Sequence, residues 1–481
     1  MLTITGEDPG DFKSDLAALT TGDFNGDGFA DVLAGARFGD GPDNGREDAG
    51  EAYVIFGSAN PPATVDLANG EQDVTIWGES GGDALGLYVA GDDLDGDGFD
   101  DIVVGAPFAK SRTVEGGEPG KAYVVYGKAH LPDEIDLANG GQDVTLIGAT
   151  SNGFFGDSLA TGDVNGDRSI DLIIGATFEG YAPSGGRPVR AGAAYVVYGG
   201  GRWPANLEMA AQDYDVAIFG QVEFDELGDN VTSADLNADG FDDVVITAEA
   251  ADGPDNSRPL AAEVHVVFGS DGLSGVFRIA EGDQDMSVLG ADAQDTLGFA
   301  LTGGDLNGDG AGDVVMGARL ASGFRNQTDG GGDAYVLFGS SHPKPLIDLA
   351  EGTAGLAAYY GADGSDFLGG SLATGDLNGD GKLELIIAAP FGGGPANSRS
   401  GAGEVYIVAR PEPGVSNSID SVPLAGVIFG AITGGKFGGA VAAGDFNGDG
   451  RDEVIVTAPE ADGPGPTRPD VGRIYVVSLG G

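Results

Sequence analysis

The amino-acid sequence predicts an all-β fold, a seven-bladed β-propeller with four antiparallel strands per blade. Three observations support this prediction. An acidic nine-residue loop, for example DLDGDGFDD, occurs seven times and returns every 69 to 72 residues, which indicates one supersecondary unit copied around an axis. Each complete repeat holds four short runs of β-branched and aromatic residues bounded by Gly, Asp and Asn. The two ends of the chain together supply the strands of the last blade.

The third repeat illustrates the four predicted strands. Residues 158–162 run into the acidic loop, residues 172–176 follow it, and residues 194–199 and 215–220 form the third and fourth runs. Four strands in about 70 residues, copied seven times, match a seven-bladed propeller. A β-helix would need shorter rungs, and a β-sandwich would not repeat so evenly.

The order of the strands within a blade follows from side-chain size. The first run consists of small residues, for example at 17–22, 302–304 and 442–444, so we expect it to lie nearest the axis, where the blades crowd together. The branched residues of the second and third runs are then expected to fill the space between blades.

The ring is expected to close through the two ends of the chain. The seventh repeat stops after its third run, 474–477, and has no fourth. Residues 2–6 (LTITG) match the fourth-run pattern TIWG, TLIG and AIFG, so we predict that this N-terminal strand completes the last blade and removes an exposed sheet edge. One domain over residues 1–481 is expected, with blades at about 12–78, 79–148, 149–220, 221–290, 291–361, 362–430, and 431–481 with 2–6.

The acidic loops are candidate calcium sites, up to seven in all. Ca²⁺ prefers six to eight oxygen ligands, and a short loop can supply them from alternate positions 1, 3, 5 and 9, with a backbone carbonyl at position 7. A glycine at position 6 allows the sharp turn that points these groups inward. The predicted ligands are Asp23, Asn25, Asp27, Phe29, Asp31; Asp93, Asp95, Asp97, Phe99, Asp101; Asp163, Asn165, Asp167, Ser169, Asp171; Asp235, Asn237, Asp239, Phe241, Asp243; Asp305, Asn307, Asp309, Ala311, Asp313; Asp376, Asn378, Asp380, Lys382, Glu384; and Asp445, Asn447, Asp449, Arg451, Glu453.

The loops have two other interpretations. An EF-hand needs a glutamate at position 12 and flanking helices, whereas position 12 here is apolar in every copy, so that interpretation is rejected. The second alternative, that Asp, Asn and Gly merely form tight turns, stays open. The copies differ in detail, because Arg168 replaces the position-6 glycine of the third loop and Glu384 and Glu453 stand at position 9 of the last two.

Composition excludes several classes of function. The 77 acidic residues against 23 Lys and Arg give a net charge of -54, which argues against nucleic-acid binding. The absence of cysteine excludes disulfides and thiolate metal sites. No apolar run approaches the ~18 residues of a membrane span. The first residues also lack the basic and apolar regions of a signal peptide. We expect a leader and further domains outside this stretch, and an extracellular or cell-surface location where calcium is plentiful.

The repeat resembles the FG-GAP family, the units that form the N-terminal propeller of integrin α-subunits. The naming residues stand at 155–156 and 437–438 (Phe-Gly) and at 105–107 (Gly-Ala-Pro). The first copy departs with Phe12-Lys13 and the fourth with Thr247-Ala248-Glu249. The resemblance implies a seven-bladed propeller with calcium loops on one face and ligand recognition on the other. Integrins keep a calcium loop in only some blades, whereas every repeat has one here.

The loops between the second and third runs each contain an arginine. In so acidic a chain, one cation per blade on one face has two interpretations. The arginines form a ring that recognises an anionic partner, or each pins its own loop to a local carboxylate or carbonyl. The residues are Arg46, Arg112, Arg187, Arg258, Arg325, Arg399 and Arg468.

Signals of catalysis are weak. His130, His265 and His342 are scattered without triad or ligand spacing, and residues 430–436 imitate a phosphate loop but are followed by Phe437 where Ser or Thr is required. We therefore expect a non-enzymatic, calcium-binding recognition or adhesion module, monomeric and part of a larger surface protein, with an extracellular protein or glycan as ligand. The alternative is the propeller domain of a secreted enzyme acting on acidic polysaccharide, which a pocket at the axis with non-repeating polar residues would favour.

Overall fold

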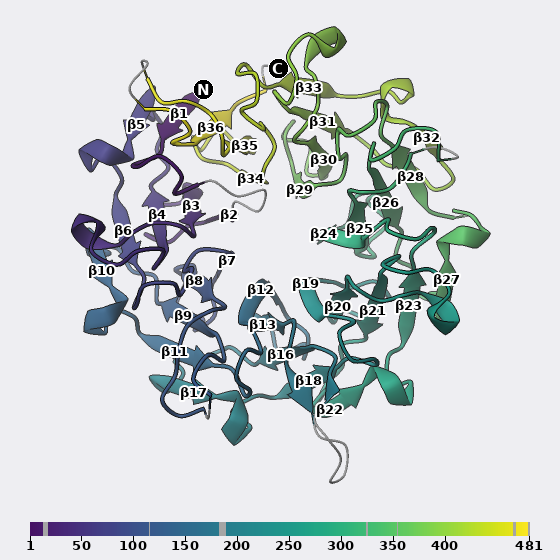
Figure 1. Ribbon diagram of the computed structural model, residues 1–481, viewed down its shortest axis with the longest axis horizontal. Coiled ribbons are helices and arrows are strands. Elements are labelled where there is room, and N and C mark those ends of the chain that lie inside the picture. The colour runs from purple at the N-terminus through teal and green to yellow at the C-terminus, as the bar shows by residue number, and fades with distance from the viewer. Residues whose placement is uncertain are drawn as a thin grey trace.

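A computed structural model describes residues 1–12, 18–114, 116–181, 189–323, 326–353, 355–464 and 468–479. Seven sheets stand around an open axis like the blades of a rotor (Figure 1). The described residues contain strands and short 3-10 turns and no α-helix. The predicted seven-bladed β-propeller is confirmed.

Four antiparallel strands run outward from the axis in each blade. In chain order they are β2 (Leu19–Gly22), β3 (Asp31–Ala36), β4 (Glu51–Ile55) and β6 (Val74–Trp77); β7 (Val89–Asp92), β8 (Asp101–Ala106), β9 (Lys121–Val125) and β11 (Val144–Ile147); β12 (Phe155–Gly162), β13 (Asp171–Ala176), β16 (Ala193–Val197) and β18 (Val216–Phe219); β19 (Leu227–Ala234), β20 (Asp243–Ala248), β21 (Glu263–Val267) and β23 (Met286–Leu289); β24 (Leu297–Gly304), β25 (Asp313–Ala318), β26 (Asp333–Leu337) and β28 (Ala357–Tyr360); β29 (Ser371–Gly375), β30 (Glu384–Ala389), β31 (Glu404–Val408) and β33 (Gly426–Phe429); and β34 (Val441–Gly444), β35 (Glu453–Ala458), β36 (Arg473–Val477) and β1 (Leu2–Thr5). A small ribbon of β14 (Gly180–Tyr181) and β15 (Val189–Arg190) extends from the third blade.

The core is divided into layers between neighbouring blades. Seven hydrophobic clusters form in the described part of the chain, one between each pair of adjacent blades. Alternate residues of β3 belong to different layers, since Val32 packs toward the last blade and Leu33 toward the second. Strands buried on both faces explain why the second runs read as nearly continuous apolar segments.

The N-terminal strand closes the ring as predicted. β1 pairs antiparallel with β36, with Leu2 opposite Val476 and Ile4 opposite Ile474. Leu2 and Ile4 are buried in the layer between the last and first blades. The two chain ends therefore meet within one blade (Figure 1).

A fifth strand was not predicted. The connection between third and fourth strands of one blade pairs in parallel with the fourth strand of the preceding blade, as Ile135 of β10 does with Ile76 of β6. Six sheets gain such a strand: β5 (Thr64–Asp66), β10 (Glu134–Asp136), β17 (Asn206–Glu208), β22 (Gly275–Arg278), β27 (Leu346–Asp348) and β32 (Ser416–Ser418). These strands are short and end at 3-10 turns, so they lack the length of apolar alternation that marks a strand in sequence. The turns are η2 (Leu67–Asn69), η3 (Leu137–Asn139), η4 (Met209–Ala211), η6 (Ile279–Glu281), η8 (Leu349–Glu351) and η10 (Ile419–Ser421).

Buried aspartates stand at the turns that lead into the first strands. Asp83 is 2% exposed, and its Oδ2 accepts a hydrogen bond from the Ser80 N–H at 3.1 Å. Its Oδ1 is buried without a hydrogen-bond partner in the described residues. Burial raises the pKa of Asp83 to about 7, and burial likewise raises the pKa of Asp11 to about 7 and of Asp295 to about 6.

These carboxyls make stability depend on pH in a defined direction. A folded-state pKa above the unfolded value of ~3.9 means that the native protein binds more protons, so the free energy of unfolding falls as pH rises from about 4 to about 7. The substitution Asp83→Asn removes the ionisable group at a similar shape. At pH 7.5 we expect it to raise the free energy of unfolding by roughly 1–4 kcal/mol, and at pH 4 to change it little. Urea unfolding at both pH values measures this, and a lower free energy of unfolding for Asp83→Asn than for the wild-type protein at pH 7.5 would contradict the prediction.

Candidate functional site

All seven acidic loops connect the first strand of a blade to the second, so they lie on one face of the ring. In the first loop the position-1 carboxylate organises the turn. Asp23 Oδ1 accepts a hydrogen bond from the Asp27 N–H and Oδ2 from the Gly28 N–H, both at 2.9 Å. The same Oδ2 bond from the position-6 N–H recurs at Asp93, Asp163, Asp235, Asp305, Asp376 and Asp445. The backbone thus holds the first acid of every loop in a fixed orientation.

The side chains at positions 3 and 5 of the first loop accept hydrogen bonds from backbone N–H groups two residues further along the chain. Asn25 Oδ1 accepts a hydrogen bond from the Asp27 N–H at 2.9 Å, and Asp27 Oδ1 accepts one from the Phe29 N–H at 3.1 Å. In the second loop, carboxylate oxygens of Asp93, Asp95 and Asp101 lie within 4.8 Å of one another, the one such group of three acidic or histidine ligands among the described residues. The other six loops have asparagine at position 3, and the last two also have glutamate at position 9.

The position-9 acid has a structural role that the sequence did not reveal. Asp31 is fully buried and accepts hydrogen bonds from the Phe24 N–H at 3.0 Å and from the Gly57 N–H at 2.9 Å, so it ties the loop to the end of the third strand. Burial raises the pKa of Asp31 to about 8. The same pair of bonds recurs at Asp101, Asp171, Asp243 and Asp313.

The two glutamates at position 9 bond differently, as their longer side chains allow. Glu384 accepts hydrogen bonds from the Leu377 N–H at 2.9 Å and from the Asn378 side-chain amide at 2.6 Å. Glu453 accepts bonds from Asn447 and from the Ser478 hydroxyl. In these loops the position-9 side chain therefore contacts the position-3 ligand directly.

The third loop is strained at Arg168. The position-6 glycines of the other loops have φ between 79° and 91°, and Arg168 has φ 72°, in the left-handed region that disfavours a side chain. We expect Arg168→Gly to raise the free energy of unfolding by about 1 kcal/mol, and more in calcium because a positive charge leaves the loop. Chemical denaturation with and without calcium measures both effects. Arg451→Gly is the control, because Arg451 at position 7 is not among the residues with a left-handed backbone. An unchanged or lowered stability would contradict the assignment of strain.

A neighbouring cation already contacts the second loop. Arg202, which follows β16, places Nε 2.7 Å from Asp95 Oδ2 and Nη2 3.2 Å from Asp97 Oδ2. The loop richest in carboxylates is therefore partly neutralised from within the chain. A metal ion there would compete with this guanidinium.

Hydrogen bonds join the loops of neighbouring blades. The Asp100 N–H donates to the Asp23 carbonyl at 3.1 Å, and Asp100 Oδ2 accepts from the Asp23 N–H at 2.7 Å. The equivalent reciprocal bonds join Asp242 with Asp163 and Asp452 with Asp376. These position-8 acids were missed in the sequence, although an aspartate at position 8 in three copies was a signal.

The arginine loops leave the opposite end of the second strands. Three of the seven predicted residues form bidentate ion pairs with the last residue of a fifth strand, which the next blade contributes: Arg46 with Asp136, Arg258 with Asp348 and Arg468 with Asp66, at 2.7 to 2.8 Å. Each of these guanidinium groups also donates to backbone carbonyls just after the fourth strand, at Gly78, Gly290 and Gly6. We name this arrangement the Arg–Asp clamp. Arg112 is exposed, Arg399 is half-buried, and Arg187 and Arg325 lie outside the described residues.

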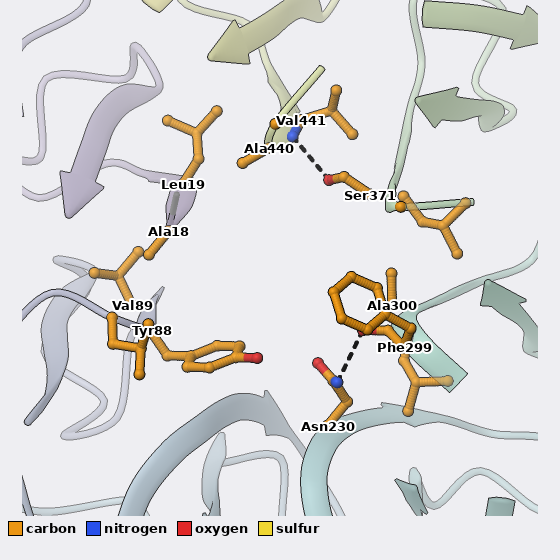
Figure 2. A pocket seen from close by; sticks show the side chains of 15 residues that line it. Ala18, Leu19, Tyr88, Val89, Asn230, Phe299, Ala300, Ser371, Ala440 and Val441 are labelled. Atoms are coloured by element: carbon orange, nitrogen blue, oxygen red, sulfur yellow. Dashed lines mark hydrogen bonds between the residues drawn. The ribbon is translucent and has the colours of Figure 1, made fainter. Parts of the chain in front are cut away.

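The axis opens into a small cavity on the face of the arginine loops. Its volume is about 160 Å³, and its walls come from the beginnings of the first strands (Figure 2). Tyr88 points inward, Asn230 donates its side-chain amide to the Phe299 carbonyl at 2.9 Å, and Ser371 Oγ accepts from the Val441 N–H at 3.0 Å. The lining residues change from blade to blade, so this mouth is not repetitive.

Three acids lie near Tyr88, which lines this mouth. Asp157 and Asp229 occupy the position after the Phe/Leu-Gly pair, and Glu249 occupies the position of the proline in Gly-Ala-Pro. Burial raises the pKa of Asp157 to about 6, although it accepts a hydrogen bond from the Thr177 hydroxyl at 2.5 Å. Burial and the adjacent Glu249 raise the pKa of Asp229 well above its usual range.

Comparison with known proteins identifies the repeat. A model of the FG-GAP repeat matches residues 10–55, 89–125, 155–197, 368–408 and 437–477. Integrin alpha pat-2 of Caenorhabditis briggsae is 28% identical over 280 residues, which cover 56% of this chain and 20% of that protein. Phosphatidylinositol-glycan-specific phospholipase D of Rattus norvegicus is 30% identical over 180 residues, which cover 37% of this chain and 20% of that protein. The chain spans about a fifth of the length of these relatives.

A distant structural likeness was also found. The crystal structure of an exotype rhamnogalacturonan lyase superposes with a TM-score of 0.44 at 12% identity, covering 98% of this chain and 72% of that chain. Within the described residues, no helix is long and apolar enough to cross a bilayer.

Proposed function

We propose that the chain is a non-enzymatic, calcium-stabilised recognition or adhesion module of the extracellular space or cell surface. The premise is that it carries FG-GAP repeats, matched in five places. One observation carries the proposal. All seven loops on one face have a position-1 carboxylate that a backbone N–H already orients. In the described hydrogen bonds, backbone N–H groups also orient the position-5 carboxylate in six loops and the position-3 side chain in four. Pre-oriented hard oxygen donors in a small loop are what Ca²⁺ requires.

The donor set of these loops fits calcium. Carboxylate and amide oxygens are hard ligands, and each oxygen that accepts one hydrogen bond keeps a further lone pair for a cation. Two candidate ligand atoms, Asp163 Oδ1 and Asn237 Oδ1, are buried without a hydrogen-bond partner in the described residues. A bound cation would satisfy both atoms. The residues at positions 1, 3, 5, 7 and 9 would hold it, and its charge would offset the mutual repulsion of the loop acids.

Calcium titration by isothermal calorimetry tests this proposal. We expect up to seven sites with dissociation constants of about 0.1–1 mM, typical of extracellular modules. Asp376→Asn, which keeps the shape of a position-1 side chain but removes its charge, should delete one site. Asp43→Asn, outside the loops, is the control. Failure of the wild-type protein to bind calcium would overturn the proposal.

Recognition is proposed for the face that bears the arginine loops and the axial mouth. Relatives named integrin alpha support a role in recognition, and the non-repeating mouth offers a surface that can discriminate ligands. We propose an extracellular protein or glycan as partner. Binding to glycan and matrix-protein arrays, with and without EDTA, tests this part. Loss of calcium with retention of all array binding would separate recognition from the metal loops.

A second function is favoured by one observation. The half-buried acids Asp157, Asp229 and Glu249 lie near Tyr88 of the axial mouth and occur in only two of the blades, and relatives named phospholipase D are enzymes. The alternative is therefore the propeller domain of a secreted enzyme acting on acidic polysaccharide. Pectate incubated with the wild-type protein should then yield new sugar ends, and Asp229→Asn should abolish them. The absence of turnover by the wild-type protein would eliminate this alternative.

A further inference from the structure

The sixth blade differs from the others at its outer edge. In six blades a parallel fifth strand covers the outer side of the fourth strand. In the sixth, β33 is the last of four strands, and no described residue pairs with its outer side (Figure 1). An uncovered edge presents backbone donors and acceptors that can pair with another chain.

The backbone donor of this edge can be identified by register. Val427 stands opposite Tyr406, as Thr75 stands opposite Tyr53 in the first blade. The outward N–H at this register position donates to the carbonyl just before the fifth strand at 2.8 to 3.1 Å in five blades, at Thr3, Thr75, Thr145, Ser287 and Ala358. No described carbonyl accepts from the Val427 N–H.

The apolar surface of β33 is uncovered as well. Fourth strands in the other blades are almost wholly buried, whereas every residue of β33 is at least partly exposed. Phe429, the last residue of β33, is 40% exposed, while Phe219 and Tyr360 at the same place in β18 and β28 are each 9% exposed. A fifth strand is what covers this position in the other blades.

The basic half of an Arg–Asp clamp is present beside this edge. Arg399 follows the 3-10 turn η9 (Pro395–Asn397), as Arg46 and Arg258 follow the matching turns η1 (Pro42–Asn44) and η5 (Pro254–Asn256). The Arg399 N–H donates to the Gly393 carbonyl at 2.7 Å. The equivalent bond in the fourth blade, from the Arg258 N–H to the Asp252 carbonyl, also measures 2.7 Å. In the described part of the chain, the Arg399 guanidinium has no ion pair or hydrogen bond, whereas Arg46 and Arg258 each hold an aspartate.

We propose that β33 and Arg399 form a docking site for an extended segment of another polypeptide with the pattern apolar–Asp–Leu. The segment adds as a parallel fifth strand, accepts the Val427 N–H, covers Phe429 and places its aspartate on Arg399. The pattern of the segment follows from the equivalent interface within the chain. There, the segments VDL, IDL and IDL at residues 65–67, 135–137 and 347–349 each place their aspartate in an Arg–Asp clamp. This strand-addition mode gives affinity through main-chain bonds and specificity through the side chains. It does not depend on the calcium proposal.

A peptide copied from the chain provides the probe. Fluorescein-labelled ATVDLANGEQD, residues 63–73, is titrated with the whole protein, and fluorescence anisotropy is recorded. We expect saturable one-to-one binding. Replacing the peptide aspartate by asparagine, or Arg399→Ala in the protein, should each weaken binding about tenfold or more, because a charge-assisted fork is lost. Arg399→Lys should give an intermediate loss, and Arg112→Ala, an exposed arginine of the second blade, should change nothing.

Val427→Pro is the matched backbone test. It removes the outward N–H and should weaken peptide binding about tenfold while the pairing with β31 stays intact. Thermal unfolding checks that each variant is folded. No binding to the wild-type protein, or binding indifferent to Arg399→Ala in a folded variant, would overturn the proposal. Sedimentation equilibrium without peptide tests whether a second copy of the chain occupies this edge instead. A wild-type dimer that excludes the peptide and dissociates on Arg399→Ala would assign the edge to that second copy and overturn the proposal.

Discussion

Chelation of calcium is expected to lower the free energy of unfolding by roughly 3–10 kcal/mol. A site with a dissociation constant of ~0.1–1 mM in millimolar calcium contributes about 0.4–1.4 kcal/mol, and seven such sites act together. Calcium binding in a loop would stabilise the whole ring, because position-8 bonds join neighbouring loops and position-9 acids connect the loop to the third strand of its blade. A loss of that size is comparable to the net stability of a domain.

Differential scanning calorimetry in calcium and in EDTA measures this effect. Magnesium in place of calcium is the control, and it should restore less of the stability because Mg²⁺ demands a tighter octahedron. The calcium-dependent part should shrink by about one seventh in Asp376→Asn. An unfolding temperature that does not respond to EDTA would contradict calcium binding at these loops.

Deletion of residues 1–6 is expected to cost roughly 4–10 kcal/mol, since it removes β1 and opens the ring. Leu2 and Ile4 are buried in the layer between the last and first blades, and each such side chain contributes about 2–5 kcal/mol. The deletion also leaves the outer edge of β36 unpaired, although its pairing with β35 remains, and leaves β5 without a partner. Because Arg468 donates to the Gly6 and Glu7 carbonyls, one Arg–Asp clamp loses the first of these two backbone acceptors.

Point variants separate the packing contribution from ring closure. Ile4→Ala should cost about 2–5 kcal/mol, and Thr3→Ala, at a partly exposed position on the opposite face of the same strand, less than about 0.5 kcal/mol. Urea unfolding of the three proteins gives the comparison. A deletion that unfolds no more easily than Ile4→Ala would show that closure adds nothing beyond one buried side chain.

The architecture was predictable because the signal repeats. Seven acidic loops at a nearly constant interval established the number of blades, and residues 2–6 matched the fourth-strand pattern closely enough to predict closure. The fifth strands were not predicted, since three residues ending in a turn carry no periodicity and their pairing joins different repeats. Only the structure shows that Asp136 contacts Arg46, 90 residues away.

The candidate site was predictable in part. The loop positions follow from spacing and ligand chemistry, and the hydrogen bonds of Asp23 and Asn25 agree with that arrangement. The burial of Asp31 could not be foreseen, because it depends on the Gly57 N–H of a distant strand. The acids Asp157, Asp229 and Glu249 come from two neighbouring repeats, and their proximity arises only when the third and fourth blades pack side by side.

Six repeats each contribute a parallel strand to the sheet of the preceding repeat. The borders of a repeat in the sequence therefore do not coincide with the borders of a packed blade. A single repeat excised at its sequence borders would carry one strand meant for a neighbour and lack the one its own sheet needs. Duplication or loss of one repeat would therefore preserve every junction, whereas fusing two half-rings cut elsewhere would not. The number of blades can then change while each strand junction is kept, although the angle between blades and the geometry of the axis would change with it.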